Sequence, residues 1–189
     1  MAHRDARIAR ESAADFLARA DEREIADILW RYGEERQSRR IARAIVARRV
    51  DSPIRGTREL AAVVEHTLGR REQNKHPATR TFQALHIQIN DELGSLQQGL
   101  QAITHALKPG GRLAVISFHS LEDRIVKTFI RGEQPRPVRR GLPQPEATPS
   151  PLHAVGRARF PSEAEVAANP RARSAVLRIA EKRPVGAAT

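Results

Sequence analysis

Ser117, His119 and Ser120 follow directly on an apolar run, and they are the side chains of this sequence best placed for chemistry. An imidazole can hydrogen-bond a base or a phosphate, or move a proton near neutral pH. It can equally cap or brace a turn, and the residues alone leave both readings of His119 open. Ser120 has Asp123 three residues later, the spacing of a helix N-cap with an acid at its third position. We therefore take His119 and Ser117 as catalytic candidates, and Ser120 with Asp123 as a cap.

The elements around this cluster read as a helix end, a tight turn, a buried strand, a polar elbow and a new helix. Lys108 to Gly111 end the first helix, and Arg112 to Phe118 form a continuous apolar strand. This order is one αβα step of a parallel sheet, and open α/β sheets bind their ligands at the carboxyl ends of strands. We predict an α/β fold. No strand followed by a glycine-rich loop precedes the step in this sequence.

The N-terminal part is predicted to be all-helical. Ser12 and Asp15 form a capping box at the first helix, and Gly33 closes the second. Residues 36 to 49 form a third helix with an apolar face and an arginine-rich face, and a fourth follows Gly56. The chain thus divides into an atypical N-terminus at 1–10, a helical domain at 11–75, a second domain at 76–183 and a tail at 184–189.

In the second domain, apolar residues recur at spacings of three and four from Phe82 to Leu107. They predict one helix of about eight turns, provided that Gly94 and Gly99 do not break it. Prolines make 132–151 a loop or flap. A short strand is expected within 152–160, and residues 174–180 alternate as a strand that can pair in the antiparallel direction.

The charge is strongly positive, with a formal net charge of +11 over 189 residues. Nine arginines lie between Arg31 and Arg58, against only Glu34, Glu35 and Asp51. A basic balance this large favours a polyanionic partner, nucleic acid first, although an arginine-rich proteome produces the same bias. The planar guanidinium group of arginine can bind two phosphate oxygens at once and stack on bases. The crowded helix face can equally be a surface that only contacts solvent. Aromatic residues make up only 4% of the sequence, so we do not expect a platform of stacked bases; Trp30 and Tyr32 are the only candidates of that kind in the first half.

Composition also excludes several classes. The sequence has no cysteine, so disulfides and cysteine-based zinc sites are excluded. The histidines show no metal-ligand spacing, and we predict no metal. No apolar run approaches the roughly 18 residues of a membrane span, and the start lacks a secretory signal. We expect a cytoplasmic protein without a membrane partner. The oligomeric state stays open, with a dimer among the alternatives.

Four stretches carry a specific resemblance. They are Tyr32 to Arg36 with Arg39 to Ile45, then Lys75 to Ala84, then Pro109 to Arg124, and finally Pro161 to Ser174. With these four stretches in this order, the chain resembles the C-terminal part of the small-subunit ribosomal RNA methyltransferase H family. The resemblance extends from about residue 11 to 182. Those enzymes transfer a methyl group from S-adenosylmethionine to N4 of a cytidine in 16S rRNA.

The resemblance implies a class I, Rossmann-like methyltransferase fold with an inserted helical domain, of which 11–75 would be the insert. The family's glycine-rich loop and acidic residue, which hold S-adenosylmethionine, find no match here, and Met1 to Arg10 do not resemble the family. We therefore expect a truncated member that binds the cofactor weakly or not at all when isolated, with no cofactor-binding residues of its own. The implied partner is 16S rRNA in the small ribosomal subunit, and the candidate contacts are Tyr32, Arg36, Arg39, Arg40, Arg43, Lys75, His76, Arg80, Arg124, Arg171 and Arg173.

Several of these candidates have structural alternatives. His76 can serve the start of a helix, and Arg124 can pair with Glu122. The exocyclic amine of cytosine is a poor nucleophile, so catalysis would depend on positioning it in line with the methyl group, after the cytidine leaves its stack. The Asp/Asn/Ser-Pro-Pro-aromatic motif of many amino-methyltransferases is absent, and Asn169-Pro170-Arg171 is too short a match.

Two other functions remain open. The first is an inactive RNA-binding remnant whose basic helices still hold rRNA. The second is a DNA-binding helix-turn-helix formed by Arg36 to Val50 and Thr57 to Leu68, but the connection between these helices is longer than usual, and the αβα step has no place in it.

Overall fold

The structure is a computed structural model that describes residues 11–69, 76–132 and 150–184. Several segments named in the sequence analysis lie outside the described residues: the N-terminus 1–10, Lys75, most of the proline-rich segment 132–151 and most of the tail 184–189. The chain divides into two compact units, residues 1–92 and 93–189, called here the helical unit and the sheet unit. The fold class α/β is confirmed, because the described residues combine helices with one three-stranded sheet.

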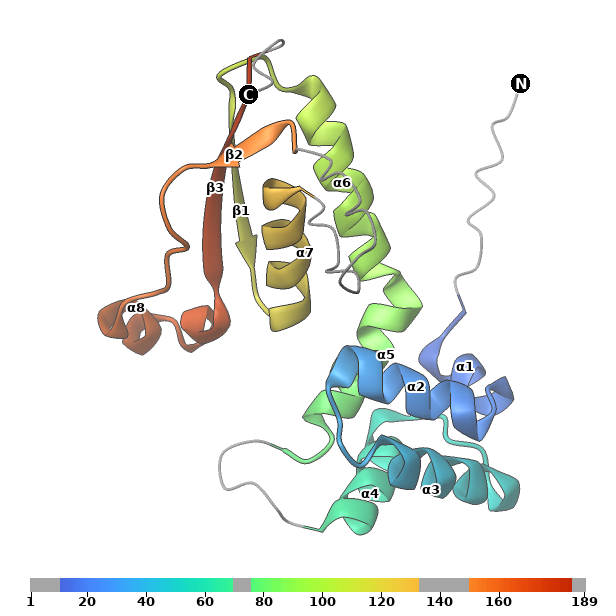
Figure 1. The fold of residues 1–189 in the computed structure, drawn as a ribbon. Coiled ribbons are helices and arrows are strands. Elements are labelled where there is room, and N and C mark those ends of the chain that lie inside the picture. The colour runs from blue at the N-terminus through green and yellow to red at the C-terminus, as the bar shows by residue number, and fades with distance from the viewer. Residues whose placement is uncertain (1–10, 70–75, 133–149, 185–189) are drawn as a thin grey trace, which may run out of the picture. The chain divides into compact units, whose positions relative to one another are not determined.

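The helical unit contains five described helices, coloured from blue to green in Figure 1. They are α1 (Ala13–Arg19), α2 (Glu22–Gly33), α3 (Ser38–Asp51), α4 (Thr57–Leu68) and α5 (Thr79–Asn90). The first four confirm the predicted helices to within two residues, except that α2 ends through Glu34, which adopts the left-handed conformation with φ 49°. Gly33 is the last helical residue rather than the cap.

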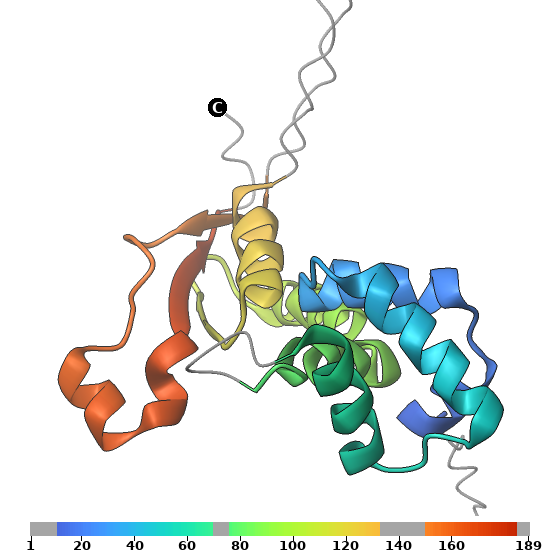
Figure 2. The same ribbon diagram turned by 90° about the horizontal axis from the view of Figure 1, so that it is seen from below.

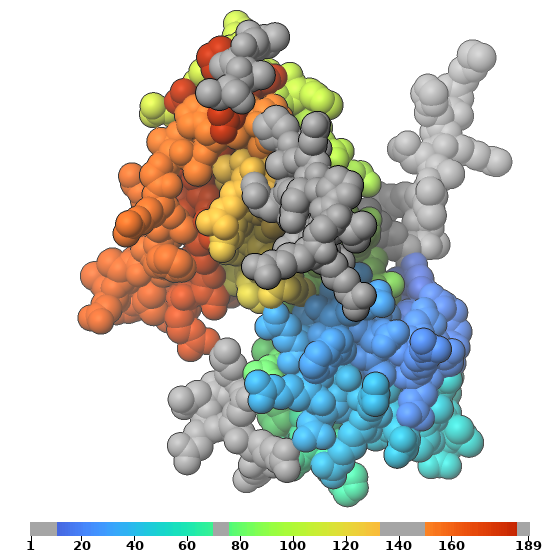
Figure 3. All heavy atoms as spheres, in the orientation of Figure 1, coloured from blue at the N-terminus to red at the C-terminus, as the bar shows by residue number. Residues whose placement is uncertain are grey.

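The core of the helical unit follows from apolar residues spaced three and four apart. Phe16, Ile25, Leu29, Ile41 and Ile45 are all fully buried in it. α2 packs against both α3 and α5, and Figures 1 and 2 show α2 and α3 side by side. Their side chains form one continuous surface in Figure 3.

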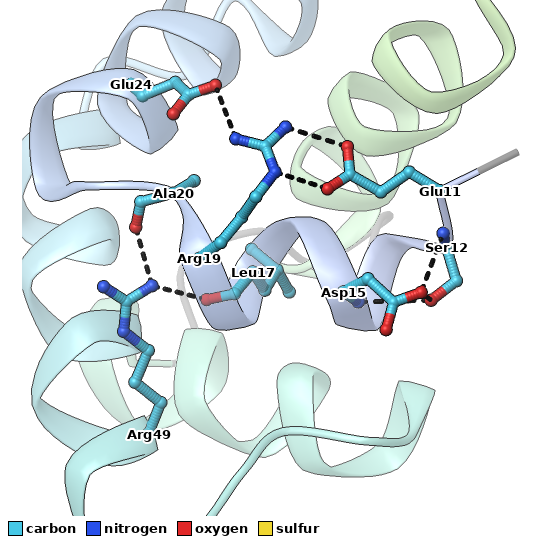
Figure 4. Close-up of polar contacts among 8 residues, drawn as sticks. All are labelled: Glu11, Ser12, Asp15, Leu17, Arg19, Ala20, Glu24 and Arg49. Atoms are coloured by element: carbon cyan, nitrogen blue, oxygen red, sulfur yellow. Dashed lines mark hydrogen bonds and ion pairs between the residues drawn. The ribbon is translucent and has the colours of Figure 1, made fainter.

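Hydrogen bonds fix α1 within this unit (Figure 4). The predicted capping box is confirmed, since Asp15 N–H donates to Ser12 Oγ at 3.1 Å and Ser12 N–H donates to Asp15 at 3.2 Å. At the other end of α1, one guanidinium nitrogen of Arg49 donates to the carbonyls of Leu17 and Ala20, both at 2.6 Å. Helix C-termini leave carbonyls unsatisfied, and this arginine satisfies two of them from α3.

Gly33 allows α2 and α5 to approach closely. A Cβ atom on this glycine would lie 2.7 Å from the Arg80 carbonyl oxygen and 3.3 Å from the Ala84 Cβ. The motif Tyr32 to Arg36 and the motif Lys75 to Ala84 are distant in sequence, and the structure brings them together at this contact. Part of what makes these motifs recognisable is therefore packing.

The prediction of one helix of about eight turns that carries the apolar residues from Phe82 to Leu107 was wrong. The helix ends at Asn90, Asp91 adopts a left-handed conformation with φ 47°, and α6 (Glu92–Ala106) follows. The glycines are not the cause, because Gly94 and Gly99 both lie inside α6. Aspartate tolerates the left-handed region better than most residues, which makes it a low-strain place to interrupt the helix.

The sheet unit contains α6, β1 (Arg112–Ser117), α7 (Ser120–Arg131), β2 (Leu152–Ala154), α8 (Glu163–Ala168), a 3₁₀ helix at Pro170–Ser174 and β3 (Val176–Lys182). The strand order is β1-β3-β2, and both pairs are antiparallel, with Arg112 opposite Glu181 and Ser117 opposite Val176. The helix–strand–helix order around β1 is confirmed. The expected parallel pairing is not found among the described residues, because the strand that returns beside β1 is β3, and it runs in the opposite direction.

Two features fix the entry to β1. Gly110 has φ 78°, and Gly111 lies so close to the Lys108 carbonyl that a Cβ atom would be 2.8 Å from it. Across the sheet, the Lys182 ammonium donates to the carbonyls of Thr104 at 2.8 Å and Leu107 at 2.6 Å. It thereby caps the end of α6 from the end of β3.

The two faces of the sheet differ. α7 lies against one face (Figures 1 and 2), where Leu113, Val126, Leu152 and Ala180 form a core with Leu100 of α6. The side chains that alternate with these along the strands point to the other face. There Ile116 is 58% exposed, and no described strand pairs with the far edge of β1.

Candidate functional site

The polar elbow between β1 and α7 is organised by His119. Its Nδ1 accepts the backbone N–H of Glu122 at 3.3 Å, while Glu122 Oε2 accepts the N–H groups of Phe118 at 2.8 Å and His119 at 3.3 Å. These reciprocal bonds make a capping box with His119 at the N-cap. The prediction that Ser120 is the cap with Asp123 as its acid was therefore wrong, since the true box begins one residue earlier.

Capping engages only the Nδ1 atom of the His119 imidazole. Because Nδ1 accepts a hydrogen bond, the neutral ring carries its proton on Nε2. Nε2 is buried and has no hydrogen-bond partner among the described residues; Glu122 Oε1 lies 3.5 Å away without the geometry of a bond. The imidazole therefore holds one N–H donor that no hydrogen bond within the described residues engages, and this donor is shielded from solvent beside the Glu122 carboxylate.

Ser117 and Phe118 complete the carboxyl end of β1 in opposite ways. Ser117 is buried at 2% exposure and lies opposite Val176 of β3. Phe118 is 57% exposed. The elbow thus presents an aromatic ring to the surface and holds its serine inside the sheet unit.

Asp123 has a structural partner. Its two oxygens accept hydrogen bonds from Arg178 Nε at 2.6 Å and Nη2 at 2.8 Å, a bidentate pair between α7 and β3. The hydrogen bonds from Arg178 hold the pKa of the Asp123 carboxyl below its usual range and raise that of the arginine. An aspartate that stays ionised in an ion pair is a poor general base at neutral pH, so it serves to fasten α7 to the sheet.

A second site lies in the helical unit, at the turn from α2 to α3. A polar groove of about 540 Å³ is lined by Ala26, Asp27, Trp30, Arg36, Gln37, Ser38, Arg39 and Arg40. The turn is rigid because the buried Glu35 accepts the Gln37 N–H at 2.8 Å and its own N–H donates to the Leu29 carbonyl at 3.1 Å. Three arginines from the list of predicted contacts are thus brought together, and Trp30 joins them.

The structure places the other candidates in the helical unit elsewhere. Arg43 lies 3.5 Å from Glu22, and Tyr32 is half-buried against the core. His76 Nε2 lies 2.7 Å from Glu65, and its Nδ1 accepts the Ala78 N–H at 3.2 Å, which is the helix-start role. Arg80 is exposed, and its backbone carbonyl forms the close contact with Gly33.

In the sheet unit, Arg124, Arg171 and Arg173 are exposed. The last two lie on the 3₁₀ helix, away from any other predicted contact in sequence. A smaller groove of about 220 Å³ was missed by the sequence analysis; it is lined in part by Lys127, Arg131, Arg157 and Arg178. Lys127 and Arg131 are four residues apart on one helix, a signal that could have found half of it.

Two kinds of feature are absent from the described residues. No helix in the described part of the chain is long and apolar enough to cross a membrane. Within the same residues, no three histidine, aspartate or glutamate side chains are grouped as a metal site requires.

Comparison with known proteins supplies a context for both sites. A family model described as the MraW methylase family matches residues 3–183, so the prediction that Met1 to Arg10 do not resemble the family was wrong from residue 3 on. Ribosomal RNA small subunit methyltransferase H of Xanthomonas euvesicatoria pv. vesicatoria (strain 85-10) is 58% identical over 177 residues, covering 93% of this chain and 52% of the relative. The protein of the same name from Stenotrophomonas maltophilia (strain K279a) is 57% identical over 178 residues, covering 94% and 55%. The chain spans about half the length of the curated relatives that it matches.

Proposed function

Since the chain belongs to the MraW methylase family, we propose that it is part of an enzyme that methylates N4 of a cytidine in 16S rRNA with S-adenosylmethionine. The observation that carries the proposal is the 58% identity to a ribosomal RNA methyltransferase, which extends over 93% of the chain and so includes both units. The elbow and the basic groove then belong to one RNA-modifying protein, working where ribosomes are made, in the cytoplasm.

In this proposal the sheet unit is the second half of a Rossmann-like methyltransferase sheet, and the helical unit is an insertion that recognises RNA. Class I sheets are covered on both faces and extend to both sides of their central strands. The unpaired edge of β1 and the exposed Ile116 are the surfaces that neighbouring strands and helices of such a sheet would cover. These two features support the assignment.

The described residues do not by themselves make a site for S-adenosylmethionine. The carboxyl end of β1 offers Ser117 and His119, while the paired glycines Gly110 and Gly111 lie at its opposite, amino end. No described strand leads into a glycine-rich loop. We therefore expect the 189-residue chain to bind the cofactor weakly or not at all, and we derive no step through it.

The contribution of this chain to catalysis is orientation. The cytosine amine has a delocalised lone pair, so its reactivity depends on how it is held. His119 Nε2 makes no hydrogen bond within the described residues, so in this proposal it donates to an oxygen of the base once RNA displaces the side chains that shield it. Its other nitrogen is fixed by the capping box, so the donor is held in one direction before RNA arrives.

A competition experiment tests the proposal. The Stenotrophomonas relative should methylate small ribosomal subunits that lack the cytidine modification, and the 189-residue chain should inhibit this reaction by occupying the same rRNA. Inhibition that more unmodified subunits relieve supports the proposal. No inhibition, at chain concentrations where the protein is folded, would sink it. Calorimetry with S-adenosylmethionine tests the expected weak cofactor binding separately.

An inactive RNA-binding protein is the second candidate, and the basic groove in the helical unit favours it. It predicts salt-dependent binding to 16S rRNA fragments and no methyl transfer even when the cofactor-binding half of a relative is supplied. Recovery of methyl transfer in that mixture would exclude it.

A further inference from the structure

Trp30 is a large aromatic side chain on the surface of α2, and packing within the helical unit does not explain its position. It is the only tryptophan of the chain and is 59% exposed, although the adjacent Leu29 on α2 is fully buried. Large aromatic side chains on a surface mark contact sites more often than other residues do. Trp30 lines the groove at the turn from α2 to α3 together with Asp27 and three arginines, so its ring shares this groove with charged side chains.

The arginines of this groove differ from Arg19 and Arg49, which have structural partners in the same unit. Arg19 pairs with Glu11 and Glu24, and Arg49 donates to two carbonyls of α1. No ion pair or hydrogen bond within the described residues engages the guanidinium groups of Arg36, Arg39 and Arg40. They retain their full capacity to bind oxygen atoms of a partner.

The position of two of these arginines is also unfavourable for the isolated helix. Arg39 and Arg40 lie in the first turn of α3, which has no acidic residue and no side-chain cap. The positive end of a helix dipole disfavours cations there. Folding of the helix does not explain two arginines at this end, whereas an anionic ligand does.

The charges within the groove are arranged in two parts. Asp27 is one turn before Trp30 on α2, and the three arginines come from the turn and from α3. A carboxylate repels phosphate but accepts hydrogen bonds from the amino groups of bases. A base therefore fits at the Trp30 side and phosphates fit at the arginine side.

We propose that this groove, formed by Asp27, Trp30, Arg36, Arg39 and Arg40, binds single-stranded RNA, with one unpaired amino-bearing base stacked on the Trp30 ring. The inference rests on the proposed function, because rRNA is the ligand class it names. Unpaired bases expose a ring face to aromatic side chains, whereas bases within a duplex do not. The neighbouring arginines bind the flanking phosphates in the paired geometry that guanidinium groups allow.

Indole fluorescence tests the proposal directly, because Trp30 is the only tryptophan of the chain. We expect short oligocytidylate to quench this fluorescence saturably, with an affinity that falls as salt rises. Oligouridylate, which has no amino group, should bind less tightly. Quenching by duplex RNA or duplex DNA at equal affinity would overturn the single-strand assignment.

Variants separate the base contact from the phosphate contacts. By anisotropy of labelled oligocytidylate, Trp30→Ala should weaken binding about 5- to 150-fold, the range for loss of one stacked base, and Trp30→Phe should recover part of it. Arg39→Ala with Arg40→Ala should weaken binding and reduce its salt dependence. Arg23→Ala with Arg58→Ala removes the same charge from exposed positions outside the groove and should have a smaller effect. Equal losses in the two double variants would overturn the proposal.

The two proposals fail in distinguishable ways. If oligocytidylate binds without quenching and Trp30→Ala binds as well as the parent, the groove is not the site, while competition on ribosomal subunits still supports the proposed function. If quenching and its loss are seen as expected but the chain does not compete on subunits, the groove binds RNA and the proposed function is wrong. Circular dichroism of each variant confirms that a loss of binding is not a loss of folding.

Discussion

The two units of the chain differ in how they treat their apolar residues. The helical unit has the larger core, with Phe16, Ile25, Leu29, Ile41 and Ile45 completely buried, and it exposes Trp30 and Val50 on its surface. The sheet unit has a smaller core and leaves Ile116 and Phe118 more than half exposed at β1, whose far edge pairs with no described strand. The helical unit therefore has the more complete core, and the exposed apolar residues at β1 are consistent with the proposal that the sheet unit belongs to a larger sheet.

The largest expected change in stability comes from a substitution in the core of the helical unit. Ile45→Ala should lower the free energy of unfolding by about 2–5 kcal/mol, because Ile45 is fully buried and truncation leaves a cavity. Chemical denaturation followed by circular dichroism measures it. Val50→Ala on the same helix is the matched control, since Val50 is 81% exposed and should change stability by less than about 0.5 kcal/mol. Similar losses in both variants would contradict the described core.

A glycine from each unit sharpens the comparison. Gly33→Ala should destabilise the helical unit by about 1–3 kcal/mol, because its Cβ would lie 2.7 Å from the Arg80 carbonyl oxygen and α2 must move away from α5. Gly99→Ala in α6 meets nothing within 4 Å and should stabilise the sheet unit by about 0.5–1 kcal/mol. Thermal denaturation of the two variants gives shifts of opposite sign. Two stabilised proteins would show that α2 and α5 are not in close contact.

The sequence predicted the helical unit well because its determinants are local. Apolar spacing placed four helices, and Ser12 with Asp15 specified a cap that needs no distant partner. The same local reasoning failed at the elbow: Ser120 and Asp123 match the capping pattern one residue after the true box, and an imidazole cap is not a signal that spacing reveals. The interruption at Asp91 was missed because the apolar stripe continues through it.

Features that depend on distant pairing were predicted only in part: the antiparallel direction of the strand at 174–180 was expected, but its pairing with β1 was not. Whether β1 has a parallel or an antiparallel neighbour is decided by β3, more than fifty residues later. Composition showed that arginines crowd α3, but only their tertiary surroundings separate Arg49, which caps α1, from Arg39 and Arg40, which line a groove beside Trp30. The candidate site was thus predicted as a set of residues and not as a surface.

The ion pair of Asp123 and Arg178 gives the sheet unit a pH dependence. Because Arg178 lowers the pKa of Asp123 in the folded state, the pair contributes stability above the unfolded pKa of about 4, and this is lost as pH falls through the folded value. Asp123→Asn should lower the free energy of unfolding by about 1 kcal/mol at pH 7, a figure reduced for partial exposure.

Denaturation of parent and variant at pH 7 and at pH 3 measures this effect, and the difference between them should shrink at the lower pH. Asp27→Asn is the control, since Asp27 is exposed on α2 and no ion pair within the described residues includes it. A difference that stays constant with pH would mean that Asp123 acts by packing rather than by charge.

The smallest effect on stability is expected at Ile116, and it separates the two units most clearly. Ile116→Thr should change the free energy of unfolding by less than about 0.5 kcal/mol, because the side chain is 58% exposed and threonine keeps the β-branched shape that strands favour. An uncovered apolar face beside an open strand edge promotes association, so the same substitution should reduce concentration-dependent self-association in analytical ultracentrifugation. Trp30→Thr, which removes an exposed apolar side chain from the helical unit, should leave that association unchanged, since the indole lies in a charged groove. Equal reductions of self-association in the two variants would show that the exposed face of β1 promotes association no more than the surface of the helical unit does. The proposal of a larger sheet around β1 would then lose its physical support.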